Sequence, residues 1–339
     1  MEQQHRRQYL LQRIALYGIQ VLAIFGVPQN LLAAGTWSPE KSVEISVPGG
    51  AGGGIDTQAR TVQQILHSLR LVEAPIVVVN KPGGSASIGL TYISRQTPNG
   101  LYIAMGSSAL LTNYIAGTST LHYTDVTPLP QLARESIAFS VRAESPIKSG
   151  QDLLRRFRQD TPSVKVGLPS IASSNHIASA LMVKAVNANP KQLSTVVFNS
   201  SAQAITALLG GHIDVVACPI LTTVPHLKRG VLRVIAITAP KRLQGEVAGI
   251  PTARELGADV VIGAYRNVLG PKGMAADKVN YWDEVFARMV ATPEWQRFMQ
   301  NNFWEDHFMR SSESAAFLKE RNAAFQTVLS ELGLVKAVQ

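Results

Sequence analysis

Along most of the chain, hydrophobic and polar positions recur in one order: a short apolar run, a polar loop, then a segment with helical spacing. The first unit shows this order clearly. The β-rich run KSVEISVP ends at a glycine loop, and DTQARTVQQILHSLR follows with apolar residues three or four positions apart. A chain that repeats strand, loop, helix and strand predicts parallel sheets covered by helices, which is an α/β fold.

The same rhythm continues through the middle of the chain. Strands are predicted at APIVVVN, LYIAMGSS, VKVGLP, LSTVVFN, IDVVACP and LRVIAIT, with helices at SIGLTYISRQ, SSNHIASALMVKAV, SAQAITALLGG and LTTVPHLKRG. From Ala275 onward the pattern predicts helices only, near residues 276–290, from Pro293 behind a Thr292 cap, and after Ser311. The aromatic residues of this part have the spacing of packing stripes: Trp282, Phe286, Trp295, Phe298 and Phe303.

The first 34 residues differ from the rest. Three arginines precede an apolar run over residues 14–27, which leads to the small pair Ala33 and Ala34. This order is typical of a secretory signal peptide, so we assign residues 1–34 to it and expect the mature chain in the periplasm. The run is shorter than the about 20 residues of a spanning helix. An uncleaved anchor is the alternative interpretation.

Composition narrows the function classes. Of 32 basic and 23 acidic residues, 29 and 22 follow residue 34, and they form no basic run of the kind that binds nucleic acid. The densest cluster, residues 155–158, is interpreted as the solvated face of a helix. The single cysteine, Cys218, lies in the apolar stretch VVACPI and is expected to be a buried small hydrophobe. The seven histidines are isolated, so we expect no metal site and no cofactor.

The glycine loop VPGGAGGGID, residues 47–56, fits neither nucleotide motif. The dinucleotide fingerprint fails at its third glycine, and a P-loop needs Lys and Ser or Thr where Ile55 and Asp56 follow Gly54. The loop leaves a strand and enters a helix that we expect Asp56 to cap, so backbone N–H groups are available to a small anion. The Asp56 charge favours a single carboxylate over phosphate. A tight turn that needs glycine for packing alone is the alternative.

Three more polar loops follow predicted strands: NKPGGSASIG, GSSA at residues 106–109, and IASSNH at residues 171–176. Ligands of open parallel sheets bind outside the carboxyl ends of the strands, so these loops predict a polar pocket. The rival interpretation is a secreted hydrolase or isomerase that uses His176 with Ser173 or Ser174. No G-x-S-x-G elbow supports it, and we predict no catalytic residue.

Seven segments together resemble one family in their order along the chain: GGGIDTQAR, VVNKPGG…IGLTYI, YTDVTPLPQLAR, LLGGHIDVV, KRGVLRVIAITAPKR, PTARELG and YRNVLGPKGM. The family is the extracytoplasmic solute receptor of tripartite tricarboxylate transporters, also called the Bug receptors, and the C-terminal part is most similar to its tricarboxylate-type branch. The resemblance implies a type II periplasmic binding-protein fold, in which two α/β lobes joined by a hinge close over a ligand. Residues 35–137 and 259–339 would form one lobe and residues 138–258 the other.

The resemblance also implies a function and a site. The chain would be a periplasmic receptor that, as a monomer, captures a small organic carboxylate and delivers it to integral membrane transporter subunits. The glycine loop, with Gly52, Gly53, Gly54 and Asp56, would hold one carboxylate, and a later loop, GAYRNVLGPKG, would face it through Tyr265 and Arg266. The remaining candidate ligand-binding residues are Ser85, Ser107, Ser108, Ser173, Ser174 and His176.

Some positions depart from the family pattern. Ser85 and Ala86 stand where a run of glycines is usual, FNSS replaces a glycine-rich segment, and YRN stands where Trp-Arg-Gly is common. The added side chains narrow a pocket, and Ser85, Asn199 and Asn267 add hydrogen-bonding groups, so the ligand need not be citrate. A ligand-sensing subunit of a signalling system is a further alternative that the sequence leaves open.

Overall fold

The computed structural model describes residues 37–336, so the expected signal peptide lies outside the described residues. Among residues 37–336, no helix combines the length and apolar character that a membrane crossing requires. The strands are β1 (Val43–Val47), β2 (Ile76–Asn80), β3 (Tyr102–Gly106), β4 (Val126–Arg142), β5 (Lys165–Leu168), β6 (Ser194–Val197), β7 (Val215–Pro219), β8 (Leu232–Ile237), β9 (Gly263–Pro271) and β10 (Trp304–Met309). The helices are α2 (Gly54–Ser68), α3 (Ser87–Ser94), α4 (Ala109–Ile115), α5 (Gly150–Asp160), α6 (Ser174–Lys184), α7 (Ser201–Leu209), α8 (Ile220–Lys228), α9 (Ala276–Val290), α10 (Pro293–Asn301) and α11 (Ser311–Glu331).

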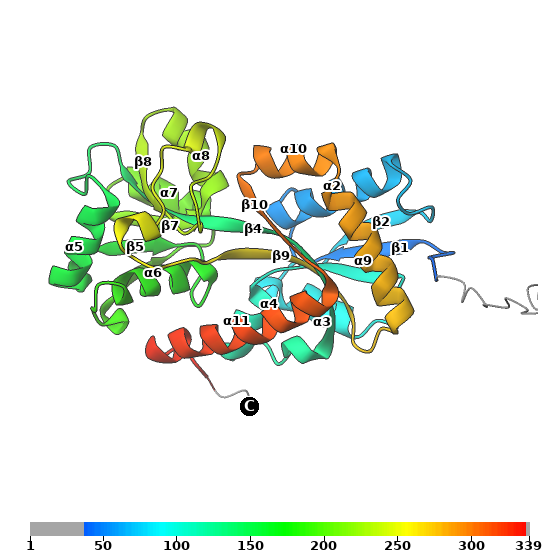
Figure 1. Ribbon diagram of the computed structural model, residues 1–339. Coiled ribbons are helices and arrows are strands. Elements are labelled where there is room, and N and C mark those ends of the chain that lie inside the picture. Colours follow the sequence, from blue (N-terminus) through cyan, green and yellow to red (C-terminus); the bar gives the residue numbers. More distant parts are fainter. Residues whose placement is uncertain (1–36, 337–339) are drawn as a thin grey trace, which may run out of the picture. The chain divides into compact units, whose positions relative to one another are not determined.

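The strands form one sheet in the order β2-β1-β3-β9-β4-β7-β5-β6, and β8 and β10 also pair with β4. Strand β1 lies parallel to β2 and β3, and β5 lies parallel to β6 and β7. These two parallel groups confirm the α/β pattern of the sequence. Figure 1 shows them at opposite ends of the long strands β4 and β9, which run antiparallel to each other between them.

Strand β4 joins the two groups because its halves have different partners. Residues up to Ser136 pair with β9 and β10, and residues from Ile137 onward pair with β7 and β8. Almost all of its 17 residues are buried. A strand covered on both faces shows no alternation of apolar and polar positions, which explains why β4 has no counterpart among the predicted strands.

Two expectations about the C-terminal third were wrong. The segment GAYRNVLGPKG, expected to be a loop, forms β9 over most of its length and pairs antiparallel with both β3 and β4. The region after Ala275, expected to hold helices only, contains β10, which pairs with β4. Only Trp304 of β10 is fully buried, so this strand lacks the apolar run by which strands are recognised.

The predicted C-terminal helices are confirmed, and their aromatic residues do pack. Trp282, Phe286 and Trp295 are completely buried in the core between α9, α10, α2 and strands β1 and β3. Phe298 borders the same core, whereas Phe303 packs against the core around β7 and α8. Burial of each such side chain contributes on the order of 1.5–3 kcal/mol, so these helices are integral to the first parallel group.

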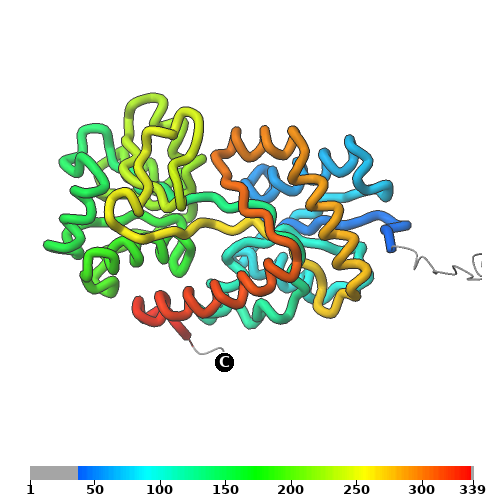
Figure 2. The backbone as a smooth tube through the Cα atoms, viewed as in Figure 1, coloured from blue at the N-terminus to red at the C-terminus, as the bar shows by residue number. Residues whose placement is uncertain are grey.

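Helix α11 connects the two parts of the sheet from one side. In Figure 2 it runs from the end of β10 past α4 towards α6, and it contacts β4, α4 and α6. Its own side chains Phe317 and Phe325 are buried. At its C-terminal end, Glu331 accepts hydrogen bonds of 2.5 and 2.6 Å from Lys184 of α6. The last helix therefore touches elements on both sides of the point at which β4 changes partners.

Candidate functional site

The glycine loop lies between β1 and α2, as predicted, but its capping differs from the expectation. Helix α2 begins at Gly54, and Gly53, in extended conformation, is its N-cap without a side-chain hydrogen bond. Asp56 is the third residue of the helix and reaches back to the loop, so the expected Asp56 cap was wrong. Gly52, Gly53 and Gly54 are all exposed, which leaves the loop backbone open to a ligand.

The Asp56 side chain, in the first turn of α2, holds the glycine loop through a hydrogen bond. Its buried carboxylate accepts hydrogen bonds from the Gly52 backbone N–H at 2.8 Å, Arg60 Nε at 3.0 Å and Asn80 Nδ2 at 2.9 Å. The hydrogen bond from Arg60, helped by those from Gly52 and Asn80, lowers the pKa of Asp56 to about 2 against the opposing effect of burial. The carboxylate stays ionised and binds the loop rather than facing a ligand.

The donors that remain for an anion are therefore few and specific. The Gly52 N–H is taken by Asp56, and the Gly53 N–H donates to the Gly50 carbonyl at 3.2 Å. The N–H groups of Gly54 and Ile55 belong to the first turn of α2, where no carbonyl of the helix can accept from them. These two amides lie at the positive end of a 15-residue helix, a position that favours the binding of anions.

The second glycine loop is held in a strained shape. Ser85 and Ala86 have φ angles of 51° and 79°, in the left-handed region that side chains other than glycine rarely adopt. Asn113 of α4 fixes the turn by donating to the Ser85 carbonyl at 2.8 Å and to Ser87 Oγ at 3.0 Å. Ser85 itself is exposed, so its hydroxyl is accessible where the family pattern has glycine.

Two of the predicted serine loops meet directly. Ser174 Oγ donates a hydrogen bond of 2.8 Å to Ser108 Oγ, and both serines are more than nine-tenths buried. Ser108 precedes α4 and Ser174 opens α6, so the contact joins the loop after β3 to the loop after β5. The neighbouring Ser107 is partly exposed and accepts from the Ala109 N–H at 3.3 Å.

The histidine of the third loop is placed to stabilise structure. Its Nδ1 accepts from the Ala172 backbone N–H at 3.3 Å, and Ser173 caps α6 by accepting from the His176 backbone N–H at 3.4 Å. Burial lowers the pKa of His176 to about 4, so the ring is neutral near pH 7. Within residues 37–336, no hydrogen bond joins this imidazole to the hydroxyl of Ser173 or Ser174, the contact that a serine nucleophile requires.

Tyr265 and Arg266 lie on β9, and adjacent strand residues point to opposite faces. The Tyr265 ring packs against Phe317 and Phe325 of α11, with centroids 4.7 and 6.1 Å apart. Arg266 forms a buried ion pair with Glu135, and its guanidinium lies 4.9 Å from the centre of the Trp304 ring. No hydrogen bond in the described part of the chain links either side chain to Gly52, Gly53 or Gly54.

Asn267 stands out beside the serine loops. Its side chain is 1% exposed, lies against Gly106 at the end of β3, and neither of its amide atoms has a hydrogen-bond partner among the described residues. Gln131, its register partner on β4, has an equally buried and unpaired Oε1. Asn267 is recognisable from the sequence as a departure from the family pattern. Gln131 is not, because no local pattern marks a single glutamine in a strand that the sequence does not predict.

A close backbone contact fixes the two glycine loops against each other. A Cβ atom on Gly89 of α3 would lie 2.6 Å from Pro48 Cα and 2.9 Å from the Lys81 carbonyl oxygen, neither of which can rotate away. We expect Gly89→Ala to lower the free energy of unfolding by about 1–3 kcal/mol, as overpacking does, measured by urea denaturation. Gly50→Ala is the matched control, because no atom lies within 4 Å of its added methyl group. Equal stabilities of the two variants would refute the contact.

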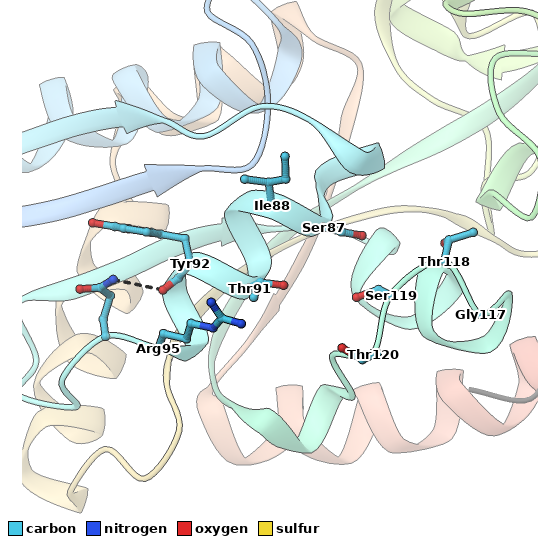
Figure 3. A pocket seen from close by; sticks show the side chains of 10 residues that line it. Ser87, Ile88, Thr91, Tyr92, Arg95, Gly117, Thr118, Ser119 and Thr120 are labelled. Carbon is cyan, nitrogen blue, oxygen red and sulfur yellow. Dashed lines mark hydrogen bonds between the residues drawn. The ribbon is translucent and has the colours of Figure 1, made fainter. Parts of the chain in front are cut away.

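Hollows on the surface lie apart from the glycine loop. One hollow, of about 670 Å³, runs between α3 and residues 117–120. Figure 3 shows Ser87 and Thr91 of α3, and Arg95 directly after the helix, opposite Ser119 and Thr120. A second hollow of about 580 Å³ lies between α8 and the end of α10. Neither is lined by Gly52, Gly53, Gly54 or the serines at the start of α6.

The described residues give no sign of metal or thiol chemistry. Among residues 37–336, no group of three or more His, Cys, Asp or Glu side chains is placed to hold a metal ion. Cys218 is completely buried, as expected, and burial raises the pKa of its thiol to about 12. A thiol with that pKa stays protonated and unreactive near pH 7.

An α/β sheet of two parallel groups, with backbone donors and hydroxyls at the ends of its strands, is the architecture of a solute-binding protein. The profile of the tripartite tricarboxylate transporter family receptor, TctC, matches residues 59–334, and the chain belongs to this family. A UPF0065 protein of Bordetella bronchiseptica is 26% identical over 333 residues, 96% of each chain. The fold and family expected from the sequence are confirmed, and the members are receptors rather than enzymes.

Solved structures show the same fold. A TctC solute-binding protein from Polaromonas has a TM-score of 0.74 at 24% identity, over 87% of this chain and 99% of that chain. An R. palustris protein solved with adipate has a TM-score of 0.74 at 21% identity, over 88% of this chain and 99% of that chain. This chain therefore shares its fold with both proteins, although more than three in four aligned residues differ.

Proposed function

We propose that this protein is an extracytoplasmic receptor that captures a small organic di- or tricarboxylate and delivers it to the membrane subunits of a tripartite tricarboxylate transporter. The observation that carries the proposal is the pair of free amides, Gly54 and Ile55, at the exposed start of α2. The family supports the transport role, and the adipate complex of a related fold supports the ligand class.

The ligand would bind where the strand-end loops converge. The amides of Gly54 and Ile55 replace water around one carboxylate, with Gly52 and Gly53 shaping the loop and Asp56 holding it. Each charge-assisted hydrogen bond contributes about 1.5–3 kcal/mol. Further contacts come from the hydroxyls and amides of the other loops and of β9: Ser85, Ser107, Ser108, Ser173, Ser174, His176 and Asn267. Tyr265 and Arg266 stay predicted ligand contacts on β9, where Tyr265 packs against α11 and Arg266 pairs with Glu135.

Binding would act by closing two lobes. We assign residues 35–137 with 259–339 to one lobe and residues 138–258 to the other, with the hinge where β4 changes partners between Ser136 and Ile137. The hydrogen bond between Ser108 and Ser174 then spans the lobes and belongs to a closed arrangement. A ligand that touches both lobes favours closure by its difference in affinity for the two states, and closure reports occupancy to the transporter.

The chain would work in the periplasm as a monomer after removal of residues 1–34. The order of basic, apolar and small residues at the N-terminus supports export, and the family consists of receptors that act outside the cytoplasm.

A thermal-shift screen of the protein from Gly35 onward tests the function. The panel contains di- and tricarboxylates, aromatic acids and acidic amino acids, each beside its uncharged amide as the control. A ligand at a hundredfold excess over its Kd should stabilise the protein by about 2.7 kcal/mol, while its amide should have little effect. Stabilisation by the amides that equals stabilisation by the acids would rule out an anion site.

A further inference from the structure

A cavity of about 270 Å³ lies away from the strand-end loops, between β4, β9, β10, α11 and the segment that leads into β9. We call it the arginine cavity. Its polar lining consists of Arg134, Arg254, Asp259, Tyr265, His307 and Arg321. None of these residues belongs to the glycine or serine loops, and Tyr265 alone is also a predicted ligand contact, so the arginines distinguish this cavity from the proposed carboxylate site.

The floor of the cavity is built by strand register. Arg134 of β4 lies directly opposite Tyr265 of β9 on one side and Glu305 of β10 on the other, so the three side chains share one face. Arg134 is 8% exposed, and its Nε and Nη2 donate to the Glu305 carboxylate at 3.4 and 2.6 Å. Its Nη1 takes no part in this pair.

Two more guanidinium groups, those of Arg321 and Arg254, line the walls of the cavity. Arg321 of α11 lies over the Phe317 ring at 5.3 Å, and its Nη2 donates to Glu320 at 2.7 Å, but its buried Nε has no partner among the described residues. Arg254 donates to Asp259 at 2.6 Å from the opposite wall. The lining therefore holds three guanidinium groups and one carboxylate. Glu305 and Glu320, outside the lining, pair with Arg134 and Arg321, so each of the three guanidinium groups has one carboxylate partner.

The other polar groups of the lining are neutral. Gln131 Nε2 lies 2.5 Å from His307 Nδ1, and burial, together with the charge of Arg134, lowers the pKa of His307. Burial raises the pKa of Tyr265, although the charges of Arg321 and Arg134 oppose it. A neutral imidazole and a protonated phenol each offer a hydrogen-bond donor. The cavity thus presents mainly hydrogen-bond donors, among them Arg134 Nη1 and Arg321 Nε, which take no part in the ion pairs.

We propose that the arginine cavity binds a small oxyanion, with the chemistry of inorganic phosphate or sulfate, as a second site beside the carboxylate site. Guanidinium groups bind oxyanions through paired N–H donors, and such an anion supplies the acceptor that the buried Arg321 Nε lacks. The volume of about 270 Å³ is sufficient for a tetrahedral oxyanion.

A bound oxyanion would link parts of the chain that are far apart in sequence. Arg254 follows β8 in the part assigned to the second lobe, whereas Arg321 lies on α11, which packs along β4 and α4. An ion held by both residues connects these elements beside the hinge. It stabilises the folded chain by mass action, so its occupancy is visible as a rise in melting temperature.

The test titrates the protein with sodium phosphate and sodium sulfate at constant ionic strength, set with sodium chloride, and follows the melting temperature and the heat of binding. We expect saturable stabilisation by both ions in the parent protein. We also expect it in Gly53→Asp, a variant of the glycine loop that leaves the cavity unchanged. Arg321→Gln and Arg254→Gln should each weaken binding by about tenfold or more, since each removes a charge-assisted hydrogen-bond donor.

Arg297→Gln is the matched control, because Arg297 forms an exposed ion pair with Glu294 on α10, and it should bind like the parent. Absence of saturable stabilisation in the parent would overturn the proposal, as would unchanged affinity in both cavity variants. An effect that is lost in Gly53→Asp but kept in the cavity variants would place the ion at the glycine loop. That result would contradict the second site but would not contradict the proposed carboxylate receptor. If no carboxylate binds but phosphate still does, the proposed carboxylate receptor is wrong and the second site stands.

Discussion

Gly53→Asp is expected to weaken carboxylate binding by at least about 100-fold while the protein remains folded, measured by calorimetry with a ligand from the thermal-shift screen. Gly53 is the N-cap of α2 with φ −74° and ψ 165°, a conformation open to any residue. Aspartate is a favoured N-cap, so the helix should keep its stability. Its carboxylate, however, accepts from the first-turn amides and repels a second anion. Loss of two charge-assisted hydrogen bonds accounts for the expected factor.

Gly53→Asn separates charge from volume, because asparagine has the shape of aspartate and also caps helices. The added Cβ lies 3.2 Å from the Gly50 carbonyl oxygen in both variants, so any strain in the loop is shared. We expect Gly53→Asn to lose about tenfold in affinity, by competition for one amide. If Gly53→Asp keeps the affinity of the parent, the loop serves packing alone and the proposed anion site is wrong.

Arg266→Met is expected to destabilise the protein by about 3–5 kcal/mol, measured by urea denaturation. The side chains of Arg266 and Glu135 are 10% and 4% exposed, and each is the ion-pair partner of the other. Removal of the guanidinium leaves the Glu135 carboxylate buried without its countercharge. The loss should exceed that of Arg297→Met at the exposed pair with Glu294, since exposed pairs contribute only about 0–1 kcal/mol.

The double variant Glu135→Gln with Arg266→Met removes both charges and should recover most of the lost stability. A single variant as stable as the parent would contradict the buried pair. The folded double variant also tests the role that family resemblance gives to Arg266. Unchanged ligand affinity would assign the arginine to the hinge, and a loss of about tenfold would mean that a ligand draws the guanidinium away from Glu135.

Local patterns were sufficient for elements whose signals lie within a few residues. The glycine loop between β1 and α2, the Thr292 cap of α10 and the start of α11 at Ser311 were predicted where the structure has them. Periodicity failed for β4, which is buried on both faces, and for β10, which has one fully buried residue. These strands depend on pairing partners far along the chain.

For the candidate site too, local sequence predicted some features and tertiary contacts decided others. The sequence predicted which loops carry donors and hydroxyls, because glycine, serine and asparagine at strand ends carry their hydrogen-bonding chemistry in any fold, and the role of these loops in ligand binding stays a prediction. It did not show that Asp56 occupies the Gly52 amide, that Ser108 meets Ser174, or that Arg266 pairs with Glu135. The last two contacts join residues 66 and 131 positions apart.

The sequence by itself determined the α/β class, the family and the chemistry of the loops, since apolar spacing and loop composition are properties of short segments. Tertiary structure alone decided which amides stay free, which face of β9 each side chain takes, and the grouping of Arg134, Arg254 and Arg321 around one cavity. The physical reason is that charge pairing and burial depend on distances in space. Strand register and chain crossing set those distances, and no local pattern encodes them.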